Sequence, residues 1–175
     1  MVVDPALPSR MKGTVLDAPL RGAPHPETGT VLAAEHLAPA PGPDGAADGA
    51  LRFDGKASKL VYDAPGFPTR NHTLSLWFRA DAPDPANKGW QEIVSAWYQG
   101  GCDPLRLALT GGQLVVRIEH PMGTFQTLGV PVMRGEWTHA AVVKRGAAMK
   151  LFINGAEAAS RSEERRVGKE CTVLC

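Results

Sequence analysis

The chain has 175 residues, of which 43% are hydrophobic, and its 19 Lys and Arg nearly balance 18 Asp and Glu, for a formal net charge of +1. A chain of this length can bury a core of its own without disulfides or a metal. The balanced charge, with no basic block before the last fifteen residues, argues against a nucleic-acid partner. No apolar run approaches the ~20 residues of a membrane-spanning helix, and Asp4, Pro5 and Pro8 stand where a signal peptide would be apolar.

The first part of the chain is rich in proline, with eight of its 15 prolines before Asp48. Proline lacks the backbone N–H that a helix needs, so this part is predicted to be non-helical. Two short apolar pieces, Thr14 to Leu20 and Gly29 to Ala33, are predicted to form an edge strand and a surface loop. We interpret residues 1–12 as a linker or interdomain segment and residues 13–160 as the folded domain.

From Ala50 onward, apolar residues alternate with polar ones, which is the period of a strand with one buried face. Turn signals separate these segments, among them Gly111-Gly112 and Asn154-Gly155, which accept the positive φ angles of tight hairpins. No segment shows the 3.6-residue period of a capped helix. Many short strands without helices predict an all-β fold, an antiparallel β-sandwich or jelly roll. The alternating apolar residues are Leu74, Leu76, Phe78, Leu105, Leu107, Leu109, Leu114, Val116 and Ile118.

Three stretches carry a resemblance to a known family. They are Gly49 to Gly55 (GALRFDG), Thr73 to Arg79 (TLSLWFR), and the region from Glu136 to Gly155, which contains EWTHAAVV and MKLFING. In this order and spacing they resemble the laminin G-like jelly roll of the concanavalin A-like lectin/glucanase superfamily. The resemblance implies a domain that is incomplete at its C-terminus, because the closing strands usual in the family do not follow Gly155. Fold resemblance alone leaves the function open.

The last residues differ from the rest of the chain. Arg161 to Cys171 read RSEERRVGKEC, which is similar to one translated reading frame of a common sequencing adapter. The segment is dense in charge, has no apolar period and follows abruptly on a well-patterned hairpin. We therefore interpret residues 161–175 as an artefactual tail, against the alternative of a genuine solvated terminus.

Catalysis has no candidate in the sequence. Relatives that hydrolyse glycans carry paired carboxylates in a Glu-x-Asp-x-x-Glu motif, because retaining hydrolysis needs two carboxyl groups about 5–5.5 Å apart. That motif is absent here, and Glu92, Glu119 and Glu136 each stand alone in their strands. The five histidines are scattered without the spacing of a transition-metal site, and His139 is expected to bond to a neighbouring strand or loop.

Binding does have candidates. If Leu74, Leu76 and Phe78 face the core, Trp77 and Arg79 point to the opposite side of their strand. An indole beside guanidinium and carboxylate groups suits a sugar, whose apolar face stacks on the ring while its hydroxyls form charged hydrogen bonds. The alternative is that Trp77 lies under a loop and the arginines form a solvated surface. The candidate ligand-binding residues, expected on one concave face, are Trp77, Arg79, Arg106, Arg117 and Glu119.

The resemblance also implies a setting and a metal. Related domains belong to secreted or cell-surface modular proteins, so we expect an extracellular module without a membrane span, fused to other domains such as a glycoside hydrolase. A structural calcium ion is implied too, for which Asp17 and Asp54 are the candidate ligands. Three functions stay open: non-catalytic binding of carbohydrate or protein, which we expect; divergent glycan hydrolysis or lysis; and a structural or adhesion role without a small ligand.

Overall fold

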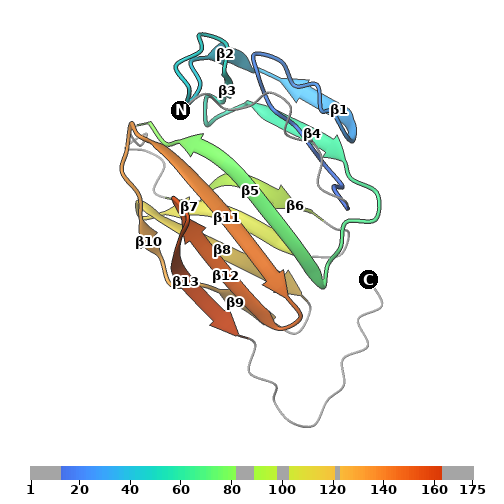
Figure 1. The fold of residues 1–175 in the computed structure, drawn as a ribbon, viewed down its shortest axis with the longest axis vertical. Helices are drawn as coiled ribbons and strands as arrows, with labels where there is room; N and C mark the ends of the chain where they lie inside the picture. The colour runs from blue at the N-terminus through green and yellow to red at the C-terminus, as the bar shows by residue number, and fades with distance from the viewer. Residues whose placement is uncertain (1–12, 82–88, 98–102, 121–122, 163–175) are drawn as a thin grey trace. The chain divides into compact units, whose positions relative to one another are not determined.

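The computed structural model describes residues 13–81, 89–97, 103–120 and 123–162. These residues form thirteen strands and no helix, which confirms the predicted all-β fold. The chain divides into two compact units, one up to Phe67 and one from Pro68 onward, and each is described by itself (Figure 1).

The first unit consists of two small antiparallel sheets. Strand β1 (Thr30–Glu35) pairs with β4 (Lys59–Asp63), and β2 (Ala38–Ala40) pairs with β3 (Ala50–Arg52). An isolated bridge joins Asp17 to Thr28. In the described residues from Gly13 to Asp48 no helix forms, as predicted. Gly29 to Ala33, expected as a surface loop, lies largely within β1, whereas Thr14 to Leu20, expected as an edge strand, contains only the isolated bridge at Asp17.

The second unit is a sandwich of two antiparallel sheets. The first sheet has the order β13-β12-β11-β5, and the second has the order β10-β8-β7-β6 with β9 also paired to β8. Ile118 and Phe125 of the second sheet line a small crevice together with Lys144 and Met149 of the first, so the two inner faces meet. The strands are β5 (Asn71–Arg79), β6 (Gln91–Ala96), β7 (Leu105–Thr110), β8 (Gln113–His120), β9 (Gly123–Gln126), β10 (Val130–Pro131), β11 (Trp137–Arg145), β12 (Ala148–Ile153) and β13 (Ala156–Ser162).

The core lies between these two sheets and follows the predicted alternation. Leu107, Leu114 and Val116 of the second sheet and Val142 and Leu151 of the first are completely buried. Each buried side chain of this size contributes roughly 1.5–3 kcal/mol relative to its exposed state. The alternation along β5, β7 and β11 therefore fixes which side chains point outward, and it is these outward faces that carry the candidate binding residues.

Strand β13 extends two residues past the predicted end of the domain at residue 160. Its pairing with β12 continues through Arg161, opposite Met149, and Ser162, opposite Ala148. The first two residues of the segment interpreted as a tail are thus part of the strand. The remainder of that segment, residues 163–175, lies outside the described residues.

Candidate functional site

The five predicted ligand-binding residues lie on two surfaces rather than one. Trp77 and Arg79 are on the outer face of the β5 sheet, because they alternate with the inward-facing Leu76 and Phe78. Arg106, Arg117 and Glu119 are on the face of the other sheet that points away from β5, and they share this face with the buried Ala108 and Val115. The outer faces of two packed sheets point away from each other, so the structure separates the first pair from the other three.

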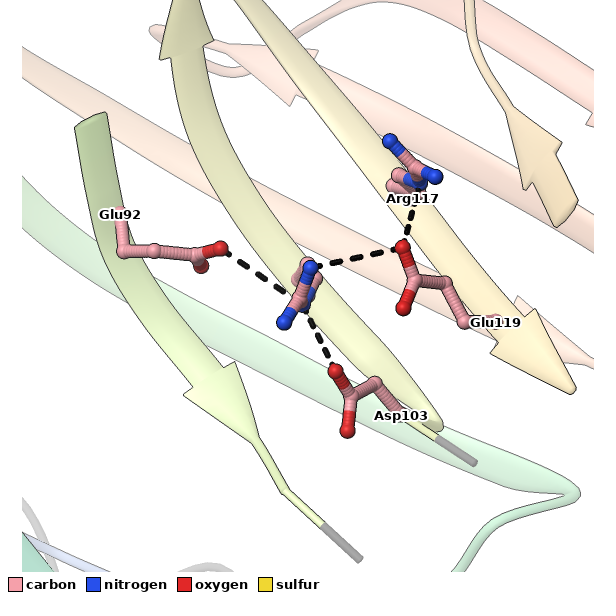
Figure 2. Close-up of polar contacts among 5 residues, drawn as sticks. Glu92, Asp103, Arg117 and Glu119 are labelled. Carbon is pink, nitrogen blue, oxygen red and sulfur yellow. Dashed lines mark hydrogen bonds and ion pairs between the residues drawn. The ribbon is translucent and has the colours of Figure 1, made fainter. Parts of the chain in front are cut away.

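Arg106 is the centre of the second surface. Figure 2 labels the other four charged residues of this surface. Its Nε lies 2.8 Å from Asp103 Oδ2 and 3.5 Å from Glu92 Oε1, and its Nη1 lies 3.4 Å from Glu119 Oε1. Arg117 Nε approaches the same Glu119 oxygen at 2.8 Å. We call these five residues, Glu92, Asp103, Arg106, Arg117 and Glu119, the arginine cluster. Three adjacent strands, β6, β7 and β8, supply four of them, and Asp103 comes from the segment just before β7.

Burial differs strongly between the members of the arginine cluster. The Asp103 side chain is only 3% exposed, whereas the other four side chains range from 22% to 40%, with Glu92 the most accessible. Partial burial raises the pKa of the Glu92 carboxyl above its ordinary value, and the nearby Asp103 and Glu119 charges raise it further, while Arg106 opposes them. Four of the five charged side chains therefore keep part of their surface open to solvent, and Asp103 is buried.

An indole flanks the arginine cluster. The guanidinium carbon of Arg117 lies 4.9 Å from the ring centroid of Trp90, within the range of a cation–π interaction. Trp90 immediately precedes β6 and remains 36% exposed. The cluster thus combines carboxylate acceptors, guanidinium donors and an aromatic side chain on one sheet face.

The outer face of the β5 sheet carries a second aromatic surface, which we call the tryptophan face and define as Ser75, Trp77, Arg79, Trp137 and His139. Trp77 is 53% exposed in the middle of a nine-residue strand. His139 lies opposite it in register on β11, with the ring centroids 5.2 Å apart. Two residues further along, Arg79 lies over the Trp137 ring, with its guanidinium carbon 5.6 Å from the centroid.

His139 is held on the tryptophan face by polar contacts on both sides. Its Nε2 is hydrogen-bonded to Ser75 Oγ at 2.9 Å. Its backbone N–H donates to Asn154 Oδ1 at 3.0 Å, and the Asn154 N–H donates to the His139 carbonyl at 2.9 Å. The expectation that His139 bonds to a neighbouring strand is therefore met, and the imidazole held in this way lies against the Trp77 ring.

The two predicted calcium ligands lie in the first unit. Asp54 Oδ1 accepts hydrogen bonds from the backbone N–H groups of Lys56, Ala57 and Ser58, at 2.8 to 2.9 Å. These bonds lower the pKa of Asp54 well below its usual range, and they engage one of its two carboxylate oxygens. Among the residues that the structure describes, no three His, Cys, Asp or Glu side chains gather as a metal site. The calcium site at Asp17 and Asp54 stays a prediction, and an unchanged melting temperature upon calcium addition or chelation would contradict it.

On the surface around Arg106, sequence reasoning left three contributors out of the predicted ligand-binding set. Glu92 was expected to stand alone, but it approaches Arg106 from a strand on the side opposite Glu119. Asp103 and Trp90 flank strands rather than lying in them, so no alternation pointed to them. Their nearness to Arg106 and Arg117 depends on strand order, which the sequence does not state.

Comparison with known families identifies the family to which the chain belongs. A laminin G-type family model, described as the concanavalin A-like lectin/glucanases superfamily, matches residues 53–171. The chain therefore belongs to this superfamily, as the sequence motifs indicated. No curated protein and no solved structure matches the chain. In the described part of the chain, no helix is long and apolar enough to cross a membrane.

Proposed function

We propose that this chain is a non-catalytic carbohydrate-binding module and that the tryptophan face binds the glycan. The observation that carries the proposal is the half-exposed Trp77 ring at the centre of a sheet face. An exposed indole that is fixed in position presents a flat apolar surface on which a sugar ring can stack without ordering a mobile side chain.

The polar neighbours of Trp77 supply what the sugar hydroxyls need. Ser75 Oγ and His139 Nε2 lie beside the indole, joined to each other at 2.9 Å. The Arg79 guanidinium, 3.3 Å from Asp81 Oδ1, adds charge-assisted donors at the end of the strand. Stacking together with hydrogen bonds of this kind distinguishes a sugar from a purely apolar ligand.

Membership of the superfamily supports the proposal, and it also suggests the setting. Related domains typically occur in extracellular modular proteins, so we infer that the module acts outside the cell on behalf of a larger protein. Its likeness to this fold does not by itself name the sugar. A protein partner on the same face is the competing binding function.

The test is binding of the full chain to a glycan array and to immobilised cellulose, xylan, mannan and β-1,3-glucan. We expect binding to at least one of them, reduced about tenfold or more by Trp77→Ala, because stacking on an indole is worth about 1–3 kcal/mol by analogy with other stacked rings. Thr73→Ala, on the same strand and exposed face, is the matched control and should bind as the wild type does. Absence of binding to every glycan, or unchanged binding by the Trp77 variant, would overturn the proposal.

The enzyme alternative has one observation in its favour, the approach of Glu92 and Glu119 to Arg106 from two sides. The guanidinium between them neutralises the charge that a nucleophile or general base would use. Release of reducing sugars from the same polysaccharides by the full chain, lost in Glu119→Gln, would replace the binding function by hydrolysis.

A further inference from the structure

The arginine cluster lies on the outer face of the sheet opposite the tryptophan face, and the proposed function does not use it. It gathers three carboxylates around two guanidiniums, so its formal charge is −1 when all five groups are ionised. The three carboxylates have more oxygen atoms than the structure shows contacts between these oxygens and guanidinium nitrogens. The cluster therefore has spare hydrogen-bond acceptors.

Asp103 provides independent evidence that the cluster is more than a stabilising ion-pair network. Its side chain is only 3% exposed, and its Oδ1 has no hydrogen-bond partner within the described residues. Buried acceptors in folded proteins nearly always have a donor, so one without a partner requires an explanation. Such exceptions occur at functional or strained sites.

The exposed members of the cluster show how a ligand would be held. Glu92 and Glu119 keep 40% and 22% of their side chains exposed, and Arg106 and Arg117 keep 28% and 27%. Glu92 on β6 and Glu119 on β8, both labelled in Figure 2, approach the Arg106 guanidinium from the strands on either side of β7. Acceptors and donors therefore alternate across one small area, with the Trp90 indole beside it.

Neutral sugars fit this arrangement better than other ligands. Each hydroxyl donates one hydrogen bond and accepts others, so a pair of neighbouring hydroxyls can bridge a carboxylate and a guanidinium. The excess negative charge disfavours acidic sugars and other anions. The Arg106 charge in the centre disfavours a metal ion for the same reason.

We propose that the arginine cluster with Trp90 is a second binding site for neutral carbohydrate, which makes the module bivalent. The inference rests on the proposed function for its ligand class, but it concerns different residues. Because the outer faces of the two sheets point in opposite directions, the two sites bind separate glycan chains. The module then links two chains instead of following one.

The test is calorimetric titration of the full chain with cellohexaose, xylohexaose, mannohexaose and laminarihexaose. We expect a stoichiometry of two hexasaccharides per chain for the wild type and one for Trp77→Ala. In the Trp77→Ala background, Glu92→Gln should weaken the remaining binding at least about tenfold, because a hydrogen bond from a sugar hydroxyl to a charged carboxylate is stronger than one to a neutral amide. Glu92→Gln keeps the side-chain shape at the most accessible position of the cluster, so the variant is expected to fold.

Thr110→Ala in the same background is the matched control, since Thr110 shares strand β7 and its outer face with Arg106. Melting temperatures of all variants establish that they are folded. A stoichiometry of one for the wild type, with all binding lost in Trp77→Ala, would overturn the second site and leave the proposed function intact. Binding that survives Trp77→Ala fully but is lost in Glu92→Gln would support the arginine cluster and overturn the tryptophan face. If the wild type binds no hexasaccharide, both proposals fail.

Discussion

His139 and Trp77 occupy directly opposite positions on β11 and β5, with their ring centroids 5.2 Å apart and their planes inclined by 53°. Such a tilted contact leaves one part of the indole covered by the imidazole and the rest open. Ser75 holds the imidazole from the neighbouring position of the same face. We therefore expect His139 to hold the exposed indole in its orientation, in addition to any hydrogen bond that it makes to a sugar hydroxyl.

This relationship predicts the effect of removing the imidazole. His139→Ala should weaken glycan binding less than Trp77→Ala does, by about 3- to 10-fold, because the indole remains but loses its fixed orientation. His139→Phe keeps a ring and loses the Ser75 hydrogen bond, so its affinity should lie between those of the wild type and His139→Ala. Titration with the best-bound hexasaccharide measures all three, and wild-type affinity in His139→Ala would contradict the positioning role.

The core between the two sheets gives a prediction about stability. Leu107 is completely buried, so Leu107→Ala should lower the free energy of unfolding by about 2–5 kcal/mol through lost burial and the cavity left behind. Leu128→Ala, in which the leucine is 83% exposed, is the control and should change it by less than about 0.5 kcal/mol. Urea denaturation followed by tryptophan fluorescence measures both, and equal losses in the two variants would show that the inner face of β7 is misassigned.

The tryptophan face could be predicted from the sequence in large part. The period of two along β5 places Trp77 and Arg79 on one face of the strand and Leu76 and Phe78 on the other, and the structure confirms this placement. Its partner His139 could not be paired with Trp77 beforehand, because β5 and β11 are far apart in the chain and adjacent only through the sheet order. Alternation fixes the face of a residue, whereas its neighbour across the strands depends on the register.

The arginine cluster shows the same limit more sharply. Glu92 lies on the face of Arg106 because β6 has an irregularity between Glu92 and Val94, which brings Glu92 opposite Ala108. Without the extra residue at Ile93, the alternation would have placed Glu92 opposite Leu109, on the inner face. A bulge of this kind leaves no clear mark in the sequence. The convergence of three carboxylates on one arginine was therefore not predictable from spacing.

Two glycines in the first unit give a prediction about close backbone packing. A Cβ atom on Gly42 would lie 2.7 Å from the Gly49 Cα, and a Cβ on Gly49 would lie 2.7 Å from the Gly42 Cα. Because backbone atoms cannot turn aside as a side chain can, each single alanine variant should lower stability by roughly 1–3 kcal/mol. Amide hydrogen exchange in β2 and β3 is the measurement, since Ala40 and Ala50 pair directly beside this contact.

The double variant tests whether the two glycines act through one contact. One added Cβ must push the two backbone segments apart, and the same movement can make room for the second Cβ. The double variant should then lose less protection against amide hydrogen exchange than the sum of the losses in the two single variants. Strict additivity, or wild-type exchange in either single variant, would contradict the close approach of the two backbones.

His72 predicts how the stability of the second unit depends on pH. Burial lowers its pKa below the ordinary value of 6.5, the Lys144 charge lowers it further, and the hydrogen bond from Nδ1 to the Pro68 carbonyl opposes both. The folded chain therefore binds fewer protons at this residue than the unfolded chain does. Stability from His72 is fully present above the unfolded pKa of about 6.5, and it is lost as the pH falls through that value toward the lower folded pKa.

The measurement is urea denaturation at pH 7.5, 6.5 and 5.5, followed by tryptophan fluorescence. The free energy of unfolding should fall between pH 7.5 and 5.5 more steeply in the wild type than in His72→Leu, which has no group to protonate at this position. His25→Gln removes an exposed histidine and serves as the control, so its pH dependence should follow that of the wild type. Equal slopes in the wild type and His72→Leu would mean that protonation of His72 does not oppose folding, and that the imidazole is reached by water in the folded chain.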